Sequence, residues 1–65
     1  MNLELLNAEA KRHQKATMDI LQQVADGEME VYEVDYKIFM AYFRHEGAKG
    51  NIEKGLDASG NELEG

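Results

Sequence analysis

The chain has no cysteine, no proline and no tryptophan, and the missing cysteine excludes the most. Without it there is no disulfide and no thiolate metal site. A chain of 65 residues buries only about 60% of the surface that its unfolded form exposes, so a monomer of this length is marginally stable. Because disulfides are excluded, we expect oligomerisation or docking onto a larger protein to supply further stability.

Basic residues are scarce. Seven Lys and Arg stand against 13 Asp and Glu, which gives a formal net charge of −6. The excess lies late in the chain, since residues 1–25 are neutral, residues 26–47 carry −4 and residues 48–65 carry −2. Direct binding to nucleic acid or to an anionic membrane surface needs an excess of Lys and Arg, so we expect neither. The charge fits a basic protein surface as partner, and it equally fits a role in solubility.

Long apolar runs are also missing. No uninterrupted stretch approaches the roughly 18 residues that a membrane-spanning helix requires. The opening stretch MNLELLNAEAKRH has no basic leader, and Glu4 and Asn7 interrupt its apolar positions. We therefore expect a soluble, cytoplasmic protein with no membrane association.

The start of the chain contains a strong helical pattern. Apolar, small or half-polar side chains recur at alternating spacings of three and four residues over three heptads. These positions are Leu3, Leu6, Ala10, His13, Thr17, Ile20 and Val24. Asn2 suits the N-cap, and no glycine interrupts the pattern. It predicts a long helix over about 2–25, with a shallow middle to its stripe that can accept large rings from a neighbouring helix.

A turn and a second helix are expected next. Asp26-Gly27 is typical of a helix end, and the short link over residues 26–31 favours an antiparallel hairpin. Residues 29–36 also alternate like a strand, but no second strand is present to pair with them. We predict a second helix over about 32–46 that ends with Gly47 in the left-handed closing position.

Residues 48–65 hold four glycines and few apolar side chains. They predict an acidic tail, disordered or loosely docked, outside a hairpin domain of residues 1–47. The expected fold class is therefore all-α, a helical hairpin with a flexible C-terminal tail.

All five aromatic residues lie in the second helix. On a helical wheel two apolar rows appear, Tyr32, Tyr36, Phe39 and Phe43 on one side and Val34, Ile38 and Ala41 on another. A helix that is apolar on both sides needs cover on both sides, and a single amphipathic neighbour covers one of them. We predict that the hairpin belongs to a dimeric helix bundle. A monomer whose tail folds back and a fold that depends on a partner protein stay open as alternatives.

Few side chains have a pattern suited to catalysis. His13 and His45 lie on different segments. We expect a half-buried, packed side chain with its ring hydrogen-bonded to a neighbour for His13, and a helix C-terminal cation for His45. Ser59, the single serine, has no His or Asp arrangement around it. A chain this short also has little room for a shielded pocket, so we expect no enzyme activity and no cofactor.

The acids from 26 to 35 resemble a calcium loop only in composition. Counted from Asp26, the sixth position is Val31 where a glycine is required, and the twelfth is Lys37 where a glutamate is required. No pair of histidines has the spacing of a zinc or di-iron site. We therefore expect no metal.

A binding surface is the remaining candidate site. Aromatic anchors beside charges are typical of interaction hot spots, and charges steer the encounter. We predict an interface made of Tyr32, Tyr36, Phe39, Tyr42, Phe43, Glu28, Glu30, Glu33 and Asp35. The first hypothesis is a small non-catalytic interaction module, such as a regulator or an inhibitor. Its partner is a second copy, a basic protein surface, or both.

The long first helix, the Asp-Gly turn and the acidic tail resemble small plasmid and phage helical-hairpin regulators. This resemblance implies that the module of the first hypothesis is a phage- or plasmid-type regulator or inhibitor of a host protein. The stretch ILQQVADGEMEVYEVDYKIFMAYFRHEG, residues 20–47, is also similar to the hairpin of small terminase subunits of podoviruses, where an I-x-D-G-E turn precedes a helix that ends in a large apolar pair and Gly. The similarity covers under half of the chain. It implies the second hypothesis, a homo-oligomeric structural or nucleic-acid-processing adaptor such as a DNA packaging subunit. There the rings lie inside the oligomer, and Lys11, Arg12 and Lys15 contact nucleic acid.

Overall fold

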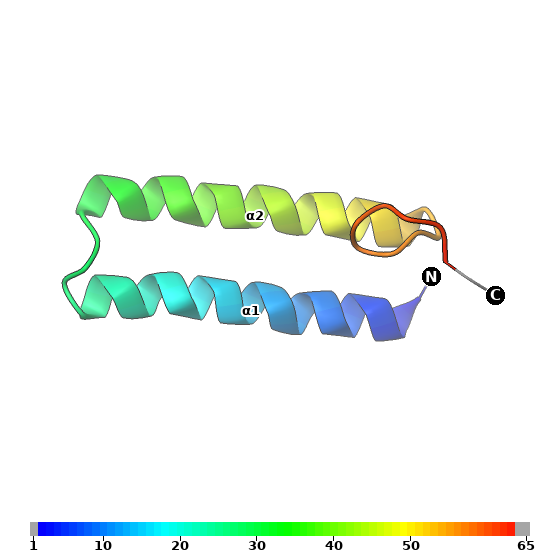
Figure 1. Ribbon diagram of the computed structural model, residues 1–65, viewed down its shortest axis with the longest axis horizontal. Coiled ribbons are helices and arrows are strands. Elements are labelled where there is room, and N and C mark those ends of the chain that lie inside the picture. The colour runs from blue at the N-terminus through cyan, green and yellow to red at the C-terminus, as the bar shows by residue number, and fades with distance from the viewer. Residues whose placement is uncertain (1, 64–65) are drawn as a thin grey trace.

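The computed structural model describes residues 2–63, which form two helices packed side by side (Figure 1). Helix α1 spans Leu3–Ala25 and helix α2 spans Val31–Glu53. The helices run antiparallel, and the molecule measures 46 × 16 × 15 Å. The predicted all-α hairpin is confirmed, and the strand considered for residues 29–36 is excluded because most of them belong to α2.

Helix α1 begins and ends where the sequence predicts. The Asn2 side chain accepts a hydrogen bond from the Leu5 backbone N–H at 3.1 Å, which satisfies one of the free donors of the first turn. At the other end Gly27 adopts a φ of 74°, and the Glu28 N–H donates to the Gln23 carbonyl oxygen at 2.9 Å. This left-handed glycine with its backward hydrogen bond is a Schellman closure, and it turns the chain toward α2.

Helix α2 is longer than the sequence predicts. Its predicted end at residue 46 is wrong, because the helix continues through Gly47 to Glu53. The glycine that closes the helix is Gly55, which adopts a φ of 86°. The Leu56 N–H donates to the Asn51 carbonyl oxygen at 3.0 Å, so α2 ends in the same closure as α1.

Burial explains why α2 passes Gly47. Ala48 and Ile52 are the two fully buried apolar residues in the described part of the chain, and Ile52 keeps only 1% of its surface exposed. Burying an isoleucine side chain stabilises by about 1.5–3 kcal/mol, and the burial of Ala48 adds to this. Together they offset the cost of about 2 kcal/mol for the two glycines inside the helix, Gly47 and Gly50. The boundary predicted after residue 47 therefore falls inside the helix.

Residues 54–63 form a loop that is closed by hydrogen bonds. The Asp57 side chain accepts from the backbone N–H groups of Ser59 and Asn61, both at 2.9 Å. The Asn51 side chain, still on α2, donates to the Ala58 carbonyl oxygen at 3.1 Å. The loop is thereby tied to the last turns of α2 at the end of the molecule where α1 begins (Figure 1).

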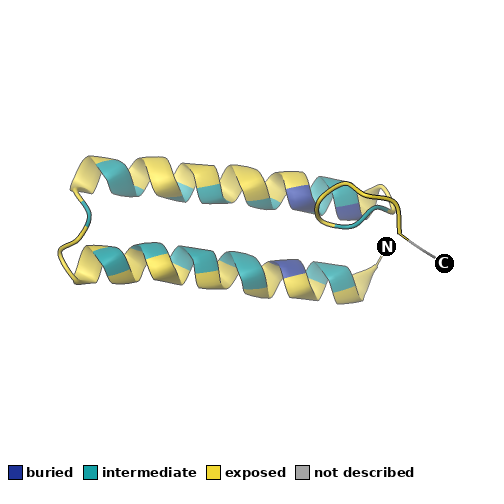
Figure 2. Cartoon of the chain, viewed as in Figure 1, coloured by how far each residue is buried: buried dark blue, intermediate teal, exposed yellow. Residues whose placement is uncertain are grey.

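The two helices meet along an interhelix seam of buried and half-buried side chains (Figure 2). Its members alternate at spacings of three and four residues on both helices, which is the pattern of antiparallel coiled-coil packing. The seam consists of Leu6, Glu9, His13, Ala16, Ile20 and Gln23 from α1 and Val34, Ile38, Ala41, His45, Ala48 and Ile52 from α2.

The predicted stripe on α1 is correct in part. Leu6, His13, Thr17 and Ile20 are half-buried as expected. Leu3, Ala10 and Val24 are exposed, which corrects the prediction. The stripe is rotated because Glu9, Ala16 and Gln23 take positions that face α2, and Glu9 finds polar partners there.

The prediction that large rings fill the shallow middle of α1 is wrong. The second apolar row of α2, which contains Val34, Ile38 and Ala41, lies in the seam. The rings of the other row are exposed to solvent. The middle of the seam is filled by small and polar side chains, Ala16, Ala41 and the two histidines.

Gly47 offers a direct test of the corrected α2. Its backbone is helical, and a Cβ added there meets no atom within 4 Å. Gly47→Ala should therefore raise the free energy of unfolding by about 0.5–1 kcal/mol. Gly55→Ala is the matched control and should lower it by about 1 kcal/mol, because its φ is 86°. Urea titrations followed by circular dichroism at one protein concentration measure both, and a Gly47→Ala protein that is destabilised would contradict the extended helix.

Candidate functional site

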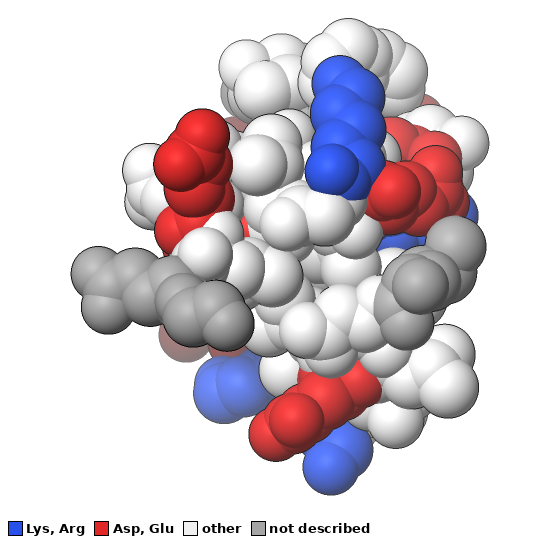
Figure 3. Space-filling view, turned by 90° about the vertical axis from the view of Figure 1, so that its right-hand side faces the viewer, with Lys and Arg blue, Asp and Glu red and all other residues white. Residues whose placement is uncertain are grey.

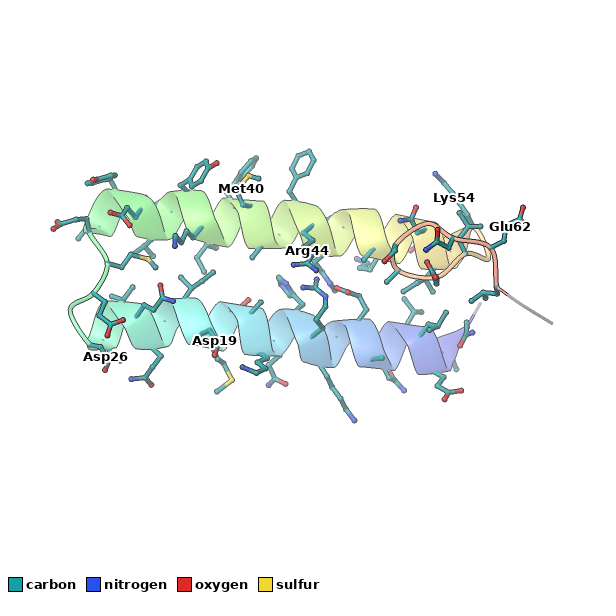
Figure 4. The ribbon with its side chains drawn as sticks, in the orientation of Figure 1. Asp19, Asp26, Met40, Arg44, Lys54 and Glu62 are labelled. Carbon is teal, nitrogen blue, oxygen red and sulfur yellow. The ribbon has the colours of Figure 1, made fainter. Side chains whose placement is uncertain are left out.

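The outer side of α2, turned away from α1, carries an exposed row of large apolar side chains. We call it the aromatic face, made of Tyr32, Tyr36, Phe39, Met40 and Phe43. Its four rings expose between 57% and 75% of their surface. Figure 4 shows Met40 pointing away from α1, with ring side chains rising from the same edge of the helix. Four of the five predicted rings therefore share one surface.

Two of these rings support one another. The ring centroids of Phe39 and Phe43, one helical turn apart, lie 5.7 Å from each other with a tilt of 48° between the planes. Tilted pairs at this distance are favourable aromatic contacts, so the two rings hold a defined arrangement without a partner. Tyr42 is exposed as well, but helix geometry places it about 120° around the axis from Tyr36. It flanks the aromatic face and is not part of it.

The predicted acids gather at one end of this surface. Glu28, Glu30 and Asp35 are exposed, and Glu33 is half-buried. Glu30 is the N-cap residue of α2 without a side-chain capping bond, and Glu33 lies in the first turn, where the helix dipole stabilises a negative charge. The acids therefore neighbour Tyr32 and do not extend along the whole face.

Charge changes sign along α2. Residues 26–36 hold five acids and no base, whereas residues 37–54 hold four Lys and Arg and two acids. Around the opposite end of the hairpin, viewed end-on in Figure 3, acidic and basic side chains are interspersed. The aromatic face thus lies between an acidic end and a weakly basic end.

A second group of polar residues lies inside the seam, and the sequence prediction missed its central member. Glu9 is 3% exposed. Its carboxylate accepts two hydrogen bonds from Arg12, at 2.6 and 2.8 Å, and one from His45 Nδ1 across the seam at 2.6 Å. The rings of His13 and His45 stack with centroids 4.1 Å apart. We call Glu9, Arg12, His13 and His45 the Glu9 cluster.

The sequence did hold a signal for the Glu9 cluster. Arg12 and His13 follow Glu9 by three and four residues, so all three share one side of α1. The predicted roles of the histidines need correction in part. His13 is half-buried as expected, but the hydrogen bond expected for its ring is not made at Nδ1, which is buried and has no partner within residues 2–63. His45 is not at a helix C-terminus, because α2 continues for eight residues beyond it, and it binds Glu9 instead.

The cluster shifts the pKa values of Glu9 and His13. The hydrogen bonds from Arg12 and His45 lower the pKa of Glu9 to about 2, with Arg12 the larger cause, although burial opposes them. Burial first, and then the nearby charges of His45 and Arg12, lower the pKa of His13. The ionised Glu9 only accepts hydrogen bonds, so His45 Nδ1 carries the proton that bridges the helices.

The described residues offer little for chemistry on a small molecule. Residues 2–63 contain no pocket and no group of three His, Cys, Asp or Glu side chains arranged to hold a metal ion. Within the Glu9 cluster both carboxylate oxygens already accept hydrogen bonds from cations or an imidazole. Neither α1 nor α2 is long and apolar enough to cross a bilayer.

The bases predicted to contact nucleic acid are mostly engaged on α1 itself. Arg12 binds the buried Glu9. Lys15 lies 3.0 Å from Asp19 one turn away, and Lys11 is exposed. These three residues therefore do not form an unneutralised basic strip.

No protein-family model, no curated protein and no solved structure matches the chain. Of what the resemblance to small terminase subunits implies, the structure contains the helical hairpin, and the packaging function stays a prediction. A proposal about function therefore rests on the aromatic face and the Glu9 cluster.

Removing the charge of Glu9 should destabilise the hairpin. Glu9→Gln leaves Arg12 and His45 without their anionic partner in a largely buried position, so the free energy of unfolding should fall by about 2 kcal/mol. Lys15→Gln is the matched control, since it breaks an exposed pair on the same helix and should change stability by less than about 0.5 kcal/mol. Equal effects of the two substitutions in urea titrations would show that the cluster does not hold the helices together.

Acid should destabilise the hairpin in two stages. His13 has a lowered pKa when folded, so its protonation favours the unfolded chain, and stability falls as pH drops below about 6.5. Glu9 has a folded pKa of about 2 against an ordinary value of 4.5, so its contribution is complete above pH 4.5 and is lost as pH falls toward 2. Unfolding free energies measured from pH 7 to pH 3 should therefore decline in two ranges, one that begins below about pH 6.5 and one that begins below pH 4.5. In Glu9→Gln the decline below pH 4.5 should be shallower, and parallel profiles would contradict the role of Glu9.

Proposed function

We propose that the chain is a small non-catalytic protein-interaction module that binds through the aromatic face of α2. One observation carries the proposal, namely that the large rings stand exposed on the side of α2 opposite to α1. Contiguous exposed apolar surface on a small protein is typical of an interaction site. Tyrosine and other large anchors also provide much of the binding energy of protein interfaces.

The arrangement supports a protein as the ligand. The rings are rigid, and Phe39 and Phe43 already contact each other, so little side-chain freedom is lost when they are covered. The acids Glu28, Glu30 and Asp35 stand at the end of the face and would steer a basic protein surface toward it. A net charge of −6 disfavours nucleic acid and anionic lipid as alternative ligands.

The non-catalytic part of the proposal is supported by how the titratable groups are used. Glu9, whose carboxylate has a strongly lowered pKa, is buried between Arg12 and His45 and connects the two helices. Residues 2–63 surround no cavity in which a substrate could approach it. The cluster thus has the geometry of a helix-to-helix connection.

More specific functions would use the same aromatic face and differ in what covers it. A dimeric helix bundle, as the sequence predicts, would cover the aromatic face with a second copy. A regulator or inhibitor of a host protein would cover it with a different protein, and a cytoplasmic location suits both. A packaging adaptor would also bury it in an oligomer, but Arg12 and Lys15 pair with acids on α1, so that interpretation has weaker support from its expected nucleic-acid contacts.

Photo-crosslinking in the source cell tests the proposal. Benzoylphenylalanine in place of Phe43 should give a discrete adduct with a protein, whereas the same probe in place of Met18, an exposed residue of α1, should give far less. Adding Tyr36→Ser, about two helical turns away on the same face, should reduce the adduct at position 43 by about tenfold or more. Equal adducts at both positions, or none at position 43, would contradict an interface on the aromatic face.

A further inference from the structure

We infer that the occupant of the aromatic face is the aromatic face of a second copy of this chain, with the two α2 helices packed antiparallel about a two-fold axis. The inference rests on the proposed function and names its partner. Three properties of the described residues carry it, which are the size of the uncovered surface, the distribution of charge along α2 and the spacing of the rings.

The first property is area. The chain exposes 5125 Å². A compact monomer of 7.4 kDa exposes about 4200 Å², so this hairpin exposes roughly 900 Å² more. One partner of a standard protein interface buries about 800 Å². The excess is therefore close to what each copy of a stable dimer contributes, and the exposed rings of α2 supply the apolar part of it.

The small core points the same way. Within residues 2–63 only Ala48 and Ile52 are fully buried apolar side chains. A single hydrophobic core in a chain this short rarely supplies enough stability, and covering the rings would add the large apolar burial that the hairpin lacks. In a dimer each copy would contribute its own aromatic face, so the two faces would form a second apolar core between the copies.

The second property is charge. Residues 26–36 carry −5 and residues 37–54 carry +2. Antiparallel packing of two α2 helices places the acidic end of each copy beside the weakly basic segment of the other, which holds Arg44 and Lys49 against one acid, Glu46. Parallel packing would place two −5 segments together. A uniformly basic partner would match the acidic end but would face like charge over residues 37–54, so a second copy fits the whole length better.

The third property is the spacing of the rings. Tyr32, Tyr36, Phe39 and Phe43 are spaced four, three and four residues apart, which is symmetric about the midpoint between Tyr36 and Phe39. A two-fold axis at that midpoint sets Tyr36 against Phe39 of the second copy and Tyr32 against its Phe43, so all four rings pair. The same register brings Arg44 next to Glu30 of the second copy, because both lie close to seven residues from the axis.

The mass in solution gives the first readout. Sedimentation equilibrium should return twice 7.4 kDa, and Phe39→Ala should raise the dimer dissociation constant by about 30-fold or more. Met18→Ala removes an equally exposed apolar side chain of α1 and should leave the dissociation constant within about twofold. A wild-type chain that stays at 7.4 kDa up to millimolar concentration would overturn the second copy as occupant.

Single cysteines test the antiparallel register, and they are clean probes because the chain has none of its own. With a short bismaleimide, Tyr36→Cys should crosslink to itself, since the two positions lie about one turn apart across the axis. Tyr32→Cys alone should not, because its copies lie about 16 Å apart along the axis, but it should crosslink when mixed with Phe43→Cys. Self-crosslinking of Tyr32→Cys would overturn the antiparallel arrangement. These readouts use variants that keep Phe39, so they stand even if Phe39→Ala fails to fold.

The outcomes also separate this inference from the proposed function. A photo-adduct at position 43 with a different protein, from a chain that stays monomeric, contradicts the second copy and leaves the interaction module standing. A dimer that is insensitive to Phe39→Ala and gives no crosslink at Tyr36 or between Tyr32 and Phe43 overturns the second copy as occupant. The proposed function is overturned as well only when the probe at position 43 also gives no adduct.

Discussion

The contact between Glu9 and His45 fixes which side of α2 faces α1. His45 Nδ1 donates to the Glu9 carboxylate at 2.6 Å, and Arg12 holds the same carboxylate from α1. Once His45 faces α1, a period of 3.6 residues fixes the rest of the helix. Tyr36, nine residues earlier, lies about 180° around the axis and must face away. The polar contact within the seam therefore selects the side of α2 that is exposed, and the aromatic face follows from it.

The hairpin itself could be predicted from local chemistry. Asn2 as cap, an uninterrupted heptad and Gly27 as closing residue act within a few residues of one another, so the sequence shows them directly. The end of α2 could not be predicted in the same way, because Gly47 and Gly55 both suit a helix end. The helix continues to Gly55 because Ile52 is buried, and this burial depends on tertiary packing that cannot be read from the neighbouring residues.

Four of the five rings of the predicted interface share one exposed surface, but the sequence did not predict that this surface faces away from α1. Hydrophobicity alone favours burying Tyr36, Phe39 and Phe43 against α1, and by that criterion the row with Val34 and Ile38 belongs outside. The structure has the reverse order, since a seam of alanines, histidines and one buried carboxylate brings the helices together. Charged residues are rarely expected in such a position, which is why Glu9 escaped notice although Arg12 and His13 stand at the right spacing beside it.

The geometry of the two ends has a consequence for anything attached to the chain. Helix α1 begins at the same end of the hairpin at which the loop of residues 54–63 closes α2, and the turn at 26–30 lies at the far end of a molecule 46 Å long (Figure 1). A tag or a cargo fused to either terminus is thus held away from the acidic turn. In an antiparallel pair the attachment points would lie at opposite ends, so the assembly would act as a spacer that keeps two cargoes apart.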